Sequence, residues 1–305
     1  MNKLSIWISA LRLRTLPLAG ASIILAAGLA LQAQIFDPLI FALSLSTALL
    51  LQILSNLAND YGDALSGADN DTRVGPERAM QSGSISHAAM KKAIIFTTLL
   101  CLFSGLSLLI VALGKDLVSW LLFIFFGLLA IIAAITYTMG KLPYGYRALG
   151  DLSVFIFFGL LGVVGSYYLY AQTFNLWLLL PACSIGMLSA AVLNINNMRD
   201  MHSDKAANKT TLVVLWGRKS AFIYHLLLVF TAPLLAGLYF IKLDNVQLWQ
   251  FAFLFALVPL QKSCRALHYA IFNERRDGVL FNQELKNTAL STFAFAVLFA
   301  VVLIP

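Results

Sequence analysis

Nine runs of about 20 mainly apolar residues divide the chain, and each is long enough to form a helix that crosses the hydrocarbon core of a bilayer. Shorter polar segments separate them. The predicted helices cover residues 16–34, 38–57, 93–113, 117–137, 152–171, 176–195, 220–241, 247–265 and 287–304. The pattern therefore predicts an all-α, polytopic membrane protein in which residues 1–305 form a single transmembrane domain.

The composition supports this class. Hydrophobic residues make up 60% of the chain and charged residues 11%, whereas soluble domains carry about 25% charged residues. Cys101, Cys183 and Cys264 lie far apart in apolar runs, which predicts neither a disulfide framework nor a thiolate metal site. The first apolar run lacks the short core and cleavage site of a signal peptide, so we expect it to be retained as a span.

Basic residues gather on one side of the predicted helices. If the N-terminus is cytoplasmic, 19 of the 21 Lys and Arg residues fall on the cytoplasmic side, and only Lys115 and Lys242 fall outside. This positive-inside distribution predicts a cytoplasmic N-terminus and, after nine spans, a periplasmic C-terminus. It also accounts for most of the net charge of +7, so the sequence gives no support for a nucleic-acid partner.

Two clusters of acids and amides follow the second and sixth predicted helices. Ionisable groups at the end of a membrane helix are costly, and they usually face a site, a partner or a metal. In the second cluster, Asn196, Asp200 and Asp204 recur every four residues, which places them on one face of a continuing helix. The same spacing appears in the first cluster as two pairs, Asn56 with Asp60 and Asn59 with Asp63.

Two such faces opposing one another would form an oxygen-rich cage, which suits Mg²⁺ held together with phosphate oxygens and water. Without clusters of Cys or His, a zinc site is not expected. The alternative is that these residues are solvated helix ends that make caps and turns. Two matched clusters at equivalent membrane depth favour the metal site.

Basic residues near the acidic clusters indicate a second ligand. Arg78 follows the first cluster, Lys141 follows the fourth helix, and Lys209 follows the second cluster. Arginine, lysine and a metal around one pocket form a clamp for diphosphate. The alternative is that each residue only obeys the positive-inside rule. We favour a functional role for these three, and the topological role for Lys205, Lys219 and Arg275.

Several of these motifs resemble those of the UbiA-type intramembrane prenyltransferases. They are Asn59-Asp60-x-x-Asp63 after the second helix, Tyr137-x-x-x-Lys141 after the fourth, and Asp200-x-x-x-Asp204 after the sixth. Within this superfamily the chain is similar to the branch that prenylates 1,4-dihydroxy-2-naphthoate in menaquinone synthesis. That similarity rests on Arg73-Val-Gly-Pro76, Pro143-Tyr-Gly-Tyr146, Asn196-Asn-Met-Arg-Asp200 and Lys209-x-Thr-Leu212. The resemblance covers essentially the whole chain.

The resemblance implies a helical bundle in the bacterial inner membrane, with a central cavity that opens to the cytoplasmic side. It implies polyprenyl transfer from a polyprenyl diphosphate to 1,4-dihydroxy-2-naphthoate with Mg²⁺ as cofactor, releasing CO₂ and diphosphate and giving a demethylmenaquinone. The expected catalytic residues are Asp60, Asp63, Asp200 and Asp204. The expected metal ligands are these four together with Asn59 and Asp69. The expected substrate-binding residues are Asn56, Asn59, Arg73, Arg78, Tyr137, Lys141, Tyr146, Arg147, Asn196, Asn197 and Lys209.

The chain departs from the family pattern at Gly67, where relatives often carry a further Asp. Asp69 is the nearest carboxylate, and it is therefore the weaker ligand candidate. Other acceptors stay open, such as 4-hydroxybenzoate or a haem vinyl group. A cation-coupled transporter is the alternative from another class, but transporter sites lie near the bilayer midplane, whereas these acids crowd the helix ends. The sequence leaves the length of the prenyl tail and the oligomeric state open.

Overall fold

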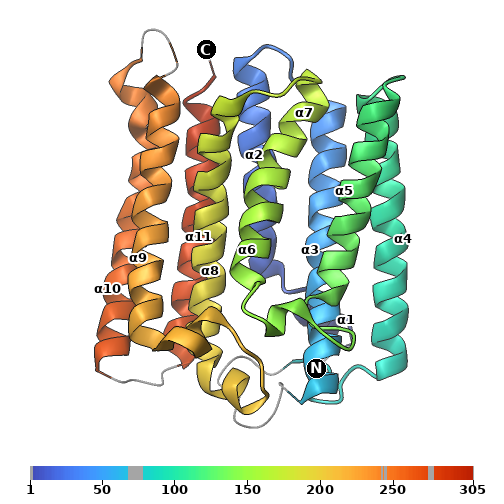
Figure 1. Cartoon of the computed structure of the whole chain (residues 1–305), viewed down its shortest axis with the longest axis vertical. Coiled ribbons are helices and arrows are strands. Elements are labelled where there is room, and N and C mark those ends of the chain that lie inside the picture. The colour runs from blue at the N-terminus through green and yellow to red at the C-terminus, as the bar shows by residue number, and fades with distance from the viewer. Residues whose placement is uncertain (1–2, 68–77, 242, 244–245, 274–277, 305) are drawn as a thin grey trace.

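The computed structural model describes residues 3–67, 78–241, 243, 246–273 and 278–304 (Figure 1), and the described part is helical without any β-strand. Asp69 and Arg73, two of the expected site residues, lie outside it. The helices are α1 (Lys3–Leu11), η1 (Leu13–Thr15), α2 (Leu16–Gln32), α3 (Pro38–Ser66), α4 (His87–Ala112), α5 (Leu117–Thr136), η2 (Tyr144–Tyr146), α6 (Gly150–Val154), η3 (Phe155–Gly165), α7 (Ser166–Ala171), η4 (Leu176–Leu178), α8 (Leu179–Ala206), α9 (Leu212–Ile241), η5 (Leu248–Ala256), α10 (Leu257–Phe272) and α11 (Gly278–Val301).

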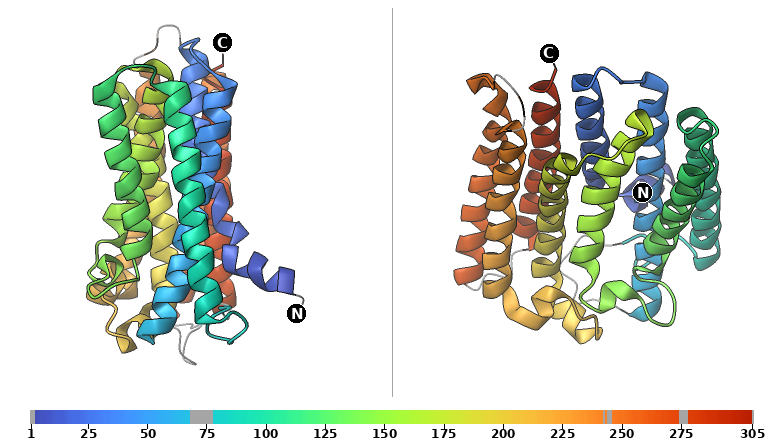
Figure 2. Two further views of the ribbon diagram at one scale, coloured as in Figure 1. Left: turned by 90° about the vertical axis from the view of Figure 1, so that its right-hand side faces the viewer. Right: turned by 45° about the horizontal axis from the view of Figure 1, so that its top comes forward.

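The long helices run side by side and form one bundle, which confirms the predicted all-α membrane class (Figure 1). Eight helical segments of the described chain are long and apolar enough to cross a membrane. The remaining predicted span, 247–265, corresponds to η5 followed by α10. The first helix, α1, was not predicted, and it projects sideways from one end of the bundle (Figure 2). The chain begins at that end and α11 finishes at the other.

Close packing of small residues holds the middle of the bundle together. α8 packs against α9, α11 and η3. A methyl group on Gly159 of η3 would lie 2.7 Å from the carbonyl oxygen of Ala182 in α8, and one on Gly28 of α2 would lie 2.5 Å from the Cα of Ala300 in α11. Lipid tails are as apolar as helix surfaces, so the hydrophobic effect does not drive helices together within a bilayer. Van der Waals contact at such close approaches is instead a main source of helix association.

The helix that contains η3 bulges locally, because Phe155–Gly165 is π-helical. Wide turns of this kind are rare and are frequent at functional sites.

Two helices extend beyond their predicted ends, and the extensions carry the acidic motifs. α3 continues to Ser66, where Gly67 ends it with a φ of 73°, a conformation that favours glycine. α8 continues to Ala206. Both clusters are therefore helical, as the four-residue spacing requires.

Two loops at this end of the bundle are joined by their backbones. The Ala148 N–H donates to the Thr210 carbonyl at 2.8 Å, and the Thr210 N–H donates to the Tyr146 carbonyl at 3.1 Å. Arg147 and Thr210 thus form an isolated parallel bridge. The segment after α5 and the segment after α8 are therefore fixed relative to each other, and both lie beside the acidic helix ends.

Candidate active site

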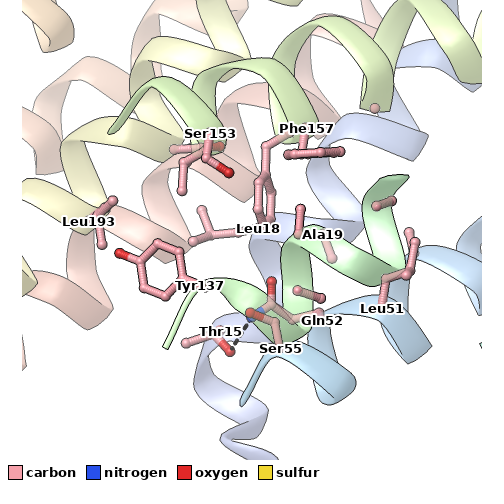
Figure 3. Close-up of a pocket in the computed structure, with 18 of the residues that line it drawn as sticks. Thr15, Leu18, Ala19, Leu51, Gln52, Ser55, Tyr137, Ser153, Phe157 and Leu193 are labelled. Carbon is pink, nitrogen blue, oxygen red and sulfur yellow. Dashed lines mark hydrogen bonds between the residues drawn. The ribbon is translucent and has the colours of Figure 1, made fainter. Parts of the chain in front are cut away.

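A cavity of about 350 Å³ lies between α2, α3, α5, η3 and α8, within the size range of small-molecule sites. Its polar end includes Asn59, Asp63, Arg78 and Lys209, while the rest is mostly apolar. In Figure 3, Thr15, Gln52, Tyr137 and Ser153 face this space from separate segments. The cavity therefore joins a charged end to an apolar interior.

Asp63 is the centre of the charged end. Its Oδ2 accepts a hydrogen bond from Arg78 Nη1 at 2.5 Å, and its Oδ1 accepts one from the Tyr146 hydroxyl at 2.6 Å. Lys209 Nζ lies 3.7 Å from Oδ1. Burial, followed by the charge of Asp63, raises the pKa of Tyr146. Tyr146 therefore stays protonated, and its hydroxyl donates the hydrogen bond to Asp63.

Lys209 connects the two acidic motifs. Its Nζ lies 3.5 Å from Asp204 Oδ1, as well as close to Asp63. Burial alone lowers the pKa of Lys209, but the carboxylates of Asp63 and Asp204 outweigh it and raise the pKa above the ordinary lysine value. The ammonium group also lies 5.2 Å from the centre of the Tyr146 ring. The ends of α3 and α8 thus face each other across one buried cation.

Asp200 has a different environment. Arg199 holds it with two bonds, Nε to Oδ1 at 2.7 Å and Nη2 to Oδ2 at 2.5 Å. The same guanidinium donates to Asn196 at 2.8 Å and to Asn282 of α11 at 2.6 Å. Sequence reasoning did not single out Arg199. Its position inside the Asn-Asn-Met-Arg-Asp motif was the available signal.

The amides of the first motif take separate roles. Asn56 donates to the Leu11 carbonyl at 2.9 Å and to the Thr15 hydroxyl at 3.0 Å, so it ties α3 to the turn before α2. Asn59 lines the cavity, and its Oδ1 accepts from the Thr138 hydroxyl at 3.2 Å.

The remaining predicted residues divide into two groups. Tyr137, Asn196 and Asn197 line the cavity, and Tyr137 has a raised pKa because of burial and the nearby Asp151. Lys141 and Arg147 are exposed and do not contribute to the lining. Residues that line the cavity but were not predicted include Arg12, Thr15, Gln52, Tyr144 and Ser153. These lie inside apolar runs or short turns, where sequence spacing gave no signal.

The donor set fits Mg²⁺ in its chemistry. Asp60, Asp63, Asp200 and Asp204 are all buried near this end, with exposed fractions of 5% or less, and carboxylate oxygens are the ligands that Mg²⁺ prefers. Within the described residues, no group of three acidic, His or Cys side chains converges on one point. Basic side chains instead contact three of these carboxylates, those of Asp63, Asp200 and Asp204. A bound metal would therefore coordinate carboxylate oxygens that are now paired with these cations.

This membrane-spanning helical bundle brings paired carboxylates, an arginine and a lysine to one end of an apolar cavity, an arrangement that can accommodate a charged headgroup with an apolar tail. The family model described as UbiA prenyltransferase family matches residues 21–286, and the chain belongs to that family.

Individual relatives agree with the family assignment. The chain is 48% identical over 269 residues to the 1,4-dihydroxy-2-naphthoate octaprenyltransferase of Escherichia coli (strain K12), covering 87% of this chain and 85% of the relative. It also resembles two solved structures. The apo structure of a UbiA homologue from Aeropyrum pernix K1 has a TM-score of 0.61 at 14% identity, covering 94% of this chain and 96% of that one. A UbiA homologue from Archaeoglobus fulgidus bound to GPP and Mg²⁺ has a TM-score of 0.57 at 17% identity, covering 94% and 98%.

Proposed function

We propose that this protein transfers a polyprenyl group from a polyprenyl diphosphate to 1,4-dihydroxy-2-naphthoate, with loss of CO₂ and diphosphate, giving a demethylmenaquinone in its reduced, quinol form. The observation behind the proposal is that Asp63 and Asp204, from two different helices, both lie beside Lys209 at the end of an apolar cavity. The naphthoate octaprenyltransferase from Escherichia coli, with 48% identity, supports the choice of acceptor.

In this proposal, the charged end binds the diphosphate. Arg78 and Lys209 can hold phosphate oxygens, because arginine binds them in a fork and lysine acts as a point charge. Asp60, Asp63, Asp200 and Asp204 would hold Mg²⁺, with Asn59 beside them. When bound, Mg²⁺ neutralises diphosphate charge and improves the leaving group. The Archaeoglobus homologue bound to GPP and Mg²⁺ supports this use of a divalent cation.

The apolar part of the cavity serves the reacting carbon. When the allylic C–O bond breaks, its electron pair leaves with the diphosphate, and an apolar wall of residues such as Leu18 and Phe157 excludes water from the allyl cation. A carbon of the electron-rich ring then forms the new C–C bond. Loss of CO₂ returns the electrons of the broken bond to the ring. Tyr137, Ser153 and Gln52 offer hydroxyl and amide groups that can orient the acceptor (Figure 3).

The decisive experiment uses the purified protein in lipid nanodiscs with octaprenyl diphosphate and Mg²⁺. 1,4-Dihydroxy-2-naphthoate and 4-hydroxybenzoate are supplied in parallel, and the product mass and released diphosphate are measured. We expect product from the naphthoate only, no product in EDTA, and recovery when Mg²⁺ is restored. Prenylation of 4-hydroxybenzoate instead, or activity that EDTA leaves unchanged, would overturn the proposal.

A further inference from the structure

Ser189 of α8 contributes a buried hydroxyl to the wall of the cavity. The residue is 1% exposed, and no group of the described chain forms a hydrogen bond with its Oγ. A buried hydroxyl without a partner is costly, because it has given up its hydrogen bonds to water. Such groups are few in native proteins, and each one calls for an explanation. A ligand in the cavity can supply the missing partner, since rotation about the Cα–Cβ bond can turn the hydroxyl toward it.

Other hydroxyls in the cavity wall already have protein partners. The Thr15 hydroxyl donates to the Arg12 carbonyl at 2.9 Å. The Ser22 hydroxyl donates to the Phe158 carbonyl at 2.6 Å. Ser189 therefore differs from these residues in having its hydrogen-bonding capacity left for a ligand.

Ser189 lies about one helical turn deeper in the cavity than the Tyr137 hydroxyl. A methyl group on Gly150 would lie 2.7 Å from that hydroxyl and 3.3 Å from Cδ2 of Leu193, and Figure 3 shows Tyr137 and Leu193 next to each other. Ser189 precedes Leu193 by four residues, so it lies on the same face of α8 and about 6 Å farther from the acidic end. A flat two-ring acceptor between Tyr137 and Ser189 can therefore reach both hydroxyls.

Ser44 of α3 is a second lining serine whose buried hydroxyl has no partner within the described part of the chain. It precedes Asn59 by fifteen residues, which is about 22 Å along the helix. Ser189 precedes Asn196 by only seven residues, or about 10 Å. In the proposed reaction the new bond forms beside the diphosphate at the charged end, so a ring held there can reach Ser189 but not Ser44.

We propose that Ser189 binds the hydroxyl of 1,4-dihydroxy-2-naphthoate that is remote from the carboxylate, and so selects a dihydroxylated acceptor. The inference rests on the proposed function and adds a residue that determines acceptor specificity. The carboxylated side of the ring lies near the charged end, because the leaving diphosphate and the carbon that it leaves are held there. The 4-hydroxyl then points into the cavity, where it can exchange a hydrogen bond with Ser189.

Equilibrium binding to Ser189→Ala tests this contact. Calorimetry is done without oxygen on the protein in nanodiscs, with Mg²⁺ and inorganic diphosphate but no prenyl donor. The two ligands are 1,4-dihydroxy-2-naphthoate and 1-hydroxy-2-naphthoate, which lacks only the remote hydroxyl. We expect the unsubstituted protein to bind the dihydroxy compound about tenfold more tightly, the value of one neutral hydrogen bond. Ser189→Ala should remove this preference by weakening the binding of the dihydroxy compound alone.

Ser184→Ala is the matched control. Ser184 lies on the same helix, is 0% exposed and has a hydroxyl without a partner among the described residues, but it does not line the cavity. We expect this variant to keep the preference of the unsubstituted protein. Thermal unfolding checks the fold of Ser189→Ala. Its melting temperature should not fall, because the change removes an unpartnered hydroxyl and alanine favours a helix.

Two results would overturn the inference. One is an equal loss of affinity for both compounds in folded Ser189→Ala, and the other is an unchanged preference for the dihydroxy compound. The second result is also the one expected if only an ordered water binds Ser189. A failure of the unsubstituted protein to prenylate 1,4-dihydroxy-2-naphthoate would overturn the proposed function itself, whereas transfer together with an unchanged preference in Ser189→Ala would overturn this inference alone.

Discussion

At the scale of single residues, Lys209 is the side chain on which the charged end depends. It is buried and contacts a carboxylate from each of two helices, so its removal leaves Asp63 and Asp204 facing each other without the cation between them. Removing one partner of a buried ion pair costs about 3–5 kcal/mol. It would also remove a proposed ligand of the diphosphate.

We therefore predict that Lys209→Ala lowers prenyl transfer by about a hundredfold or more, the loss expected when a preorganised charge in a site is removed. It should also lower the melting temperature of the detergent-solubilised protein. Lys205→Ala is the control, because Lys205 lies four residues earlier, in the last turn of α8, and is exposed. If Lys209→Ala were as active as the control, the charge of Lys209 would serve only to orient the protein in the membrane.

Arg199 and Asp200 form the second charged unit, in which one guanidinium holds one carboxylate with two hydrogen bonds. The arginine side chain is 1% exposed and donates to Asp200, Asn196 and Asn282. Arg199→Met should lower stability by about 3–5 kcal/mol, because it leaves a buried carboxylate without its partner.

The double variant Arg199→Met/Asp200→Asn provides the check on this pair. It removes both charges together, so we expect it to unfold at a higher temperature than either single variant, as measured by thermal unfolding in detergent. The coupling energy between the two residues is the stability change of the double variant minus the sum of the changes in the two single variants. Additive losses in the double variant would show that the two side chains do not depend on each other.

At the scale of elements, the paired loops position the site. Tyr146 and Lys209 both reach Asp63 from segments that the backbone bridge at Thr210 holds together. Thr210→Pro removes the N–H that donates to the Tyr146 carbonyl, so we predict at least about a tenfold loss of activity, the usual effect of small misplacement of catalytic groups. Thr210→Ala keeps the N–H and should retain activity. The comparison is made in membranes with equal amounts of each variant.

The same elements show how far sequence reasoning extends. Apolar run length predicted each spanning helix, and four-residue spacing predicted that Asp200 and Asp204 share a helix face. Spacing along one helix does not define which neighbour that face meets, so the bond between Arg199 and Asn282, 83 positions apart, was not predicted. For the same reason Lys141 was expected at the site, whereas it lies exposed on its loop. Which distant segments come together is decided by how the helices pack, and the spacing of residues along one helix does not determine that packing.

At the scale of the whole molecule, the charge asymmetry and the fold lead to one orientation. The acidic helix ends, the paired loops and α1 all lie at one end of the bundle, and α11 finishes at the other (Figure 1). By the spans predicted from the sequence, 19 of the 21 Lys and Arg residues belong to the side of the acidic clusters, and the two exceptions are Lys115 and Lys242. Because basic segments are retained in the cytoplasm, the charged end of the cavity should face the cytoplasm.

Cysteine labelling in intact cells tests this orientation. Cysteine is placed at Lys115, in the exposed turn between α4 and α5, or at Lys205, exposed in the last turn of α8, in a variant whose three native cysteines are replaced by alanine. A membrane-impermeant maleimide should label position 115 in intact cells, and position 205 only after the inner membrane is opened. The reverse pattern would place the charged end outside, where the 19 basic residues would have had to cross the membrane. Labelling at both positions in intact cells would contradict a single orientation.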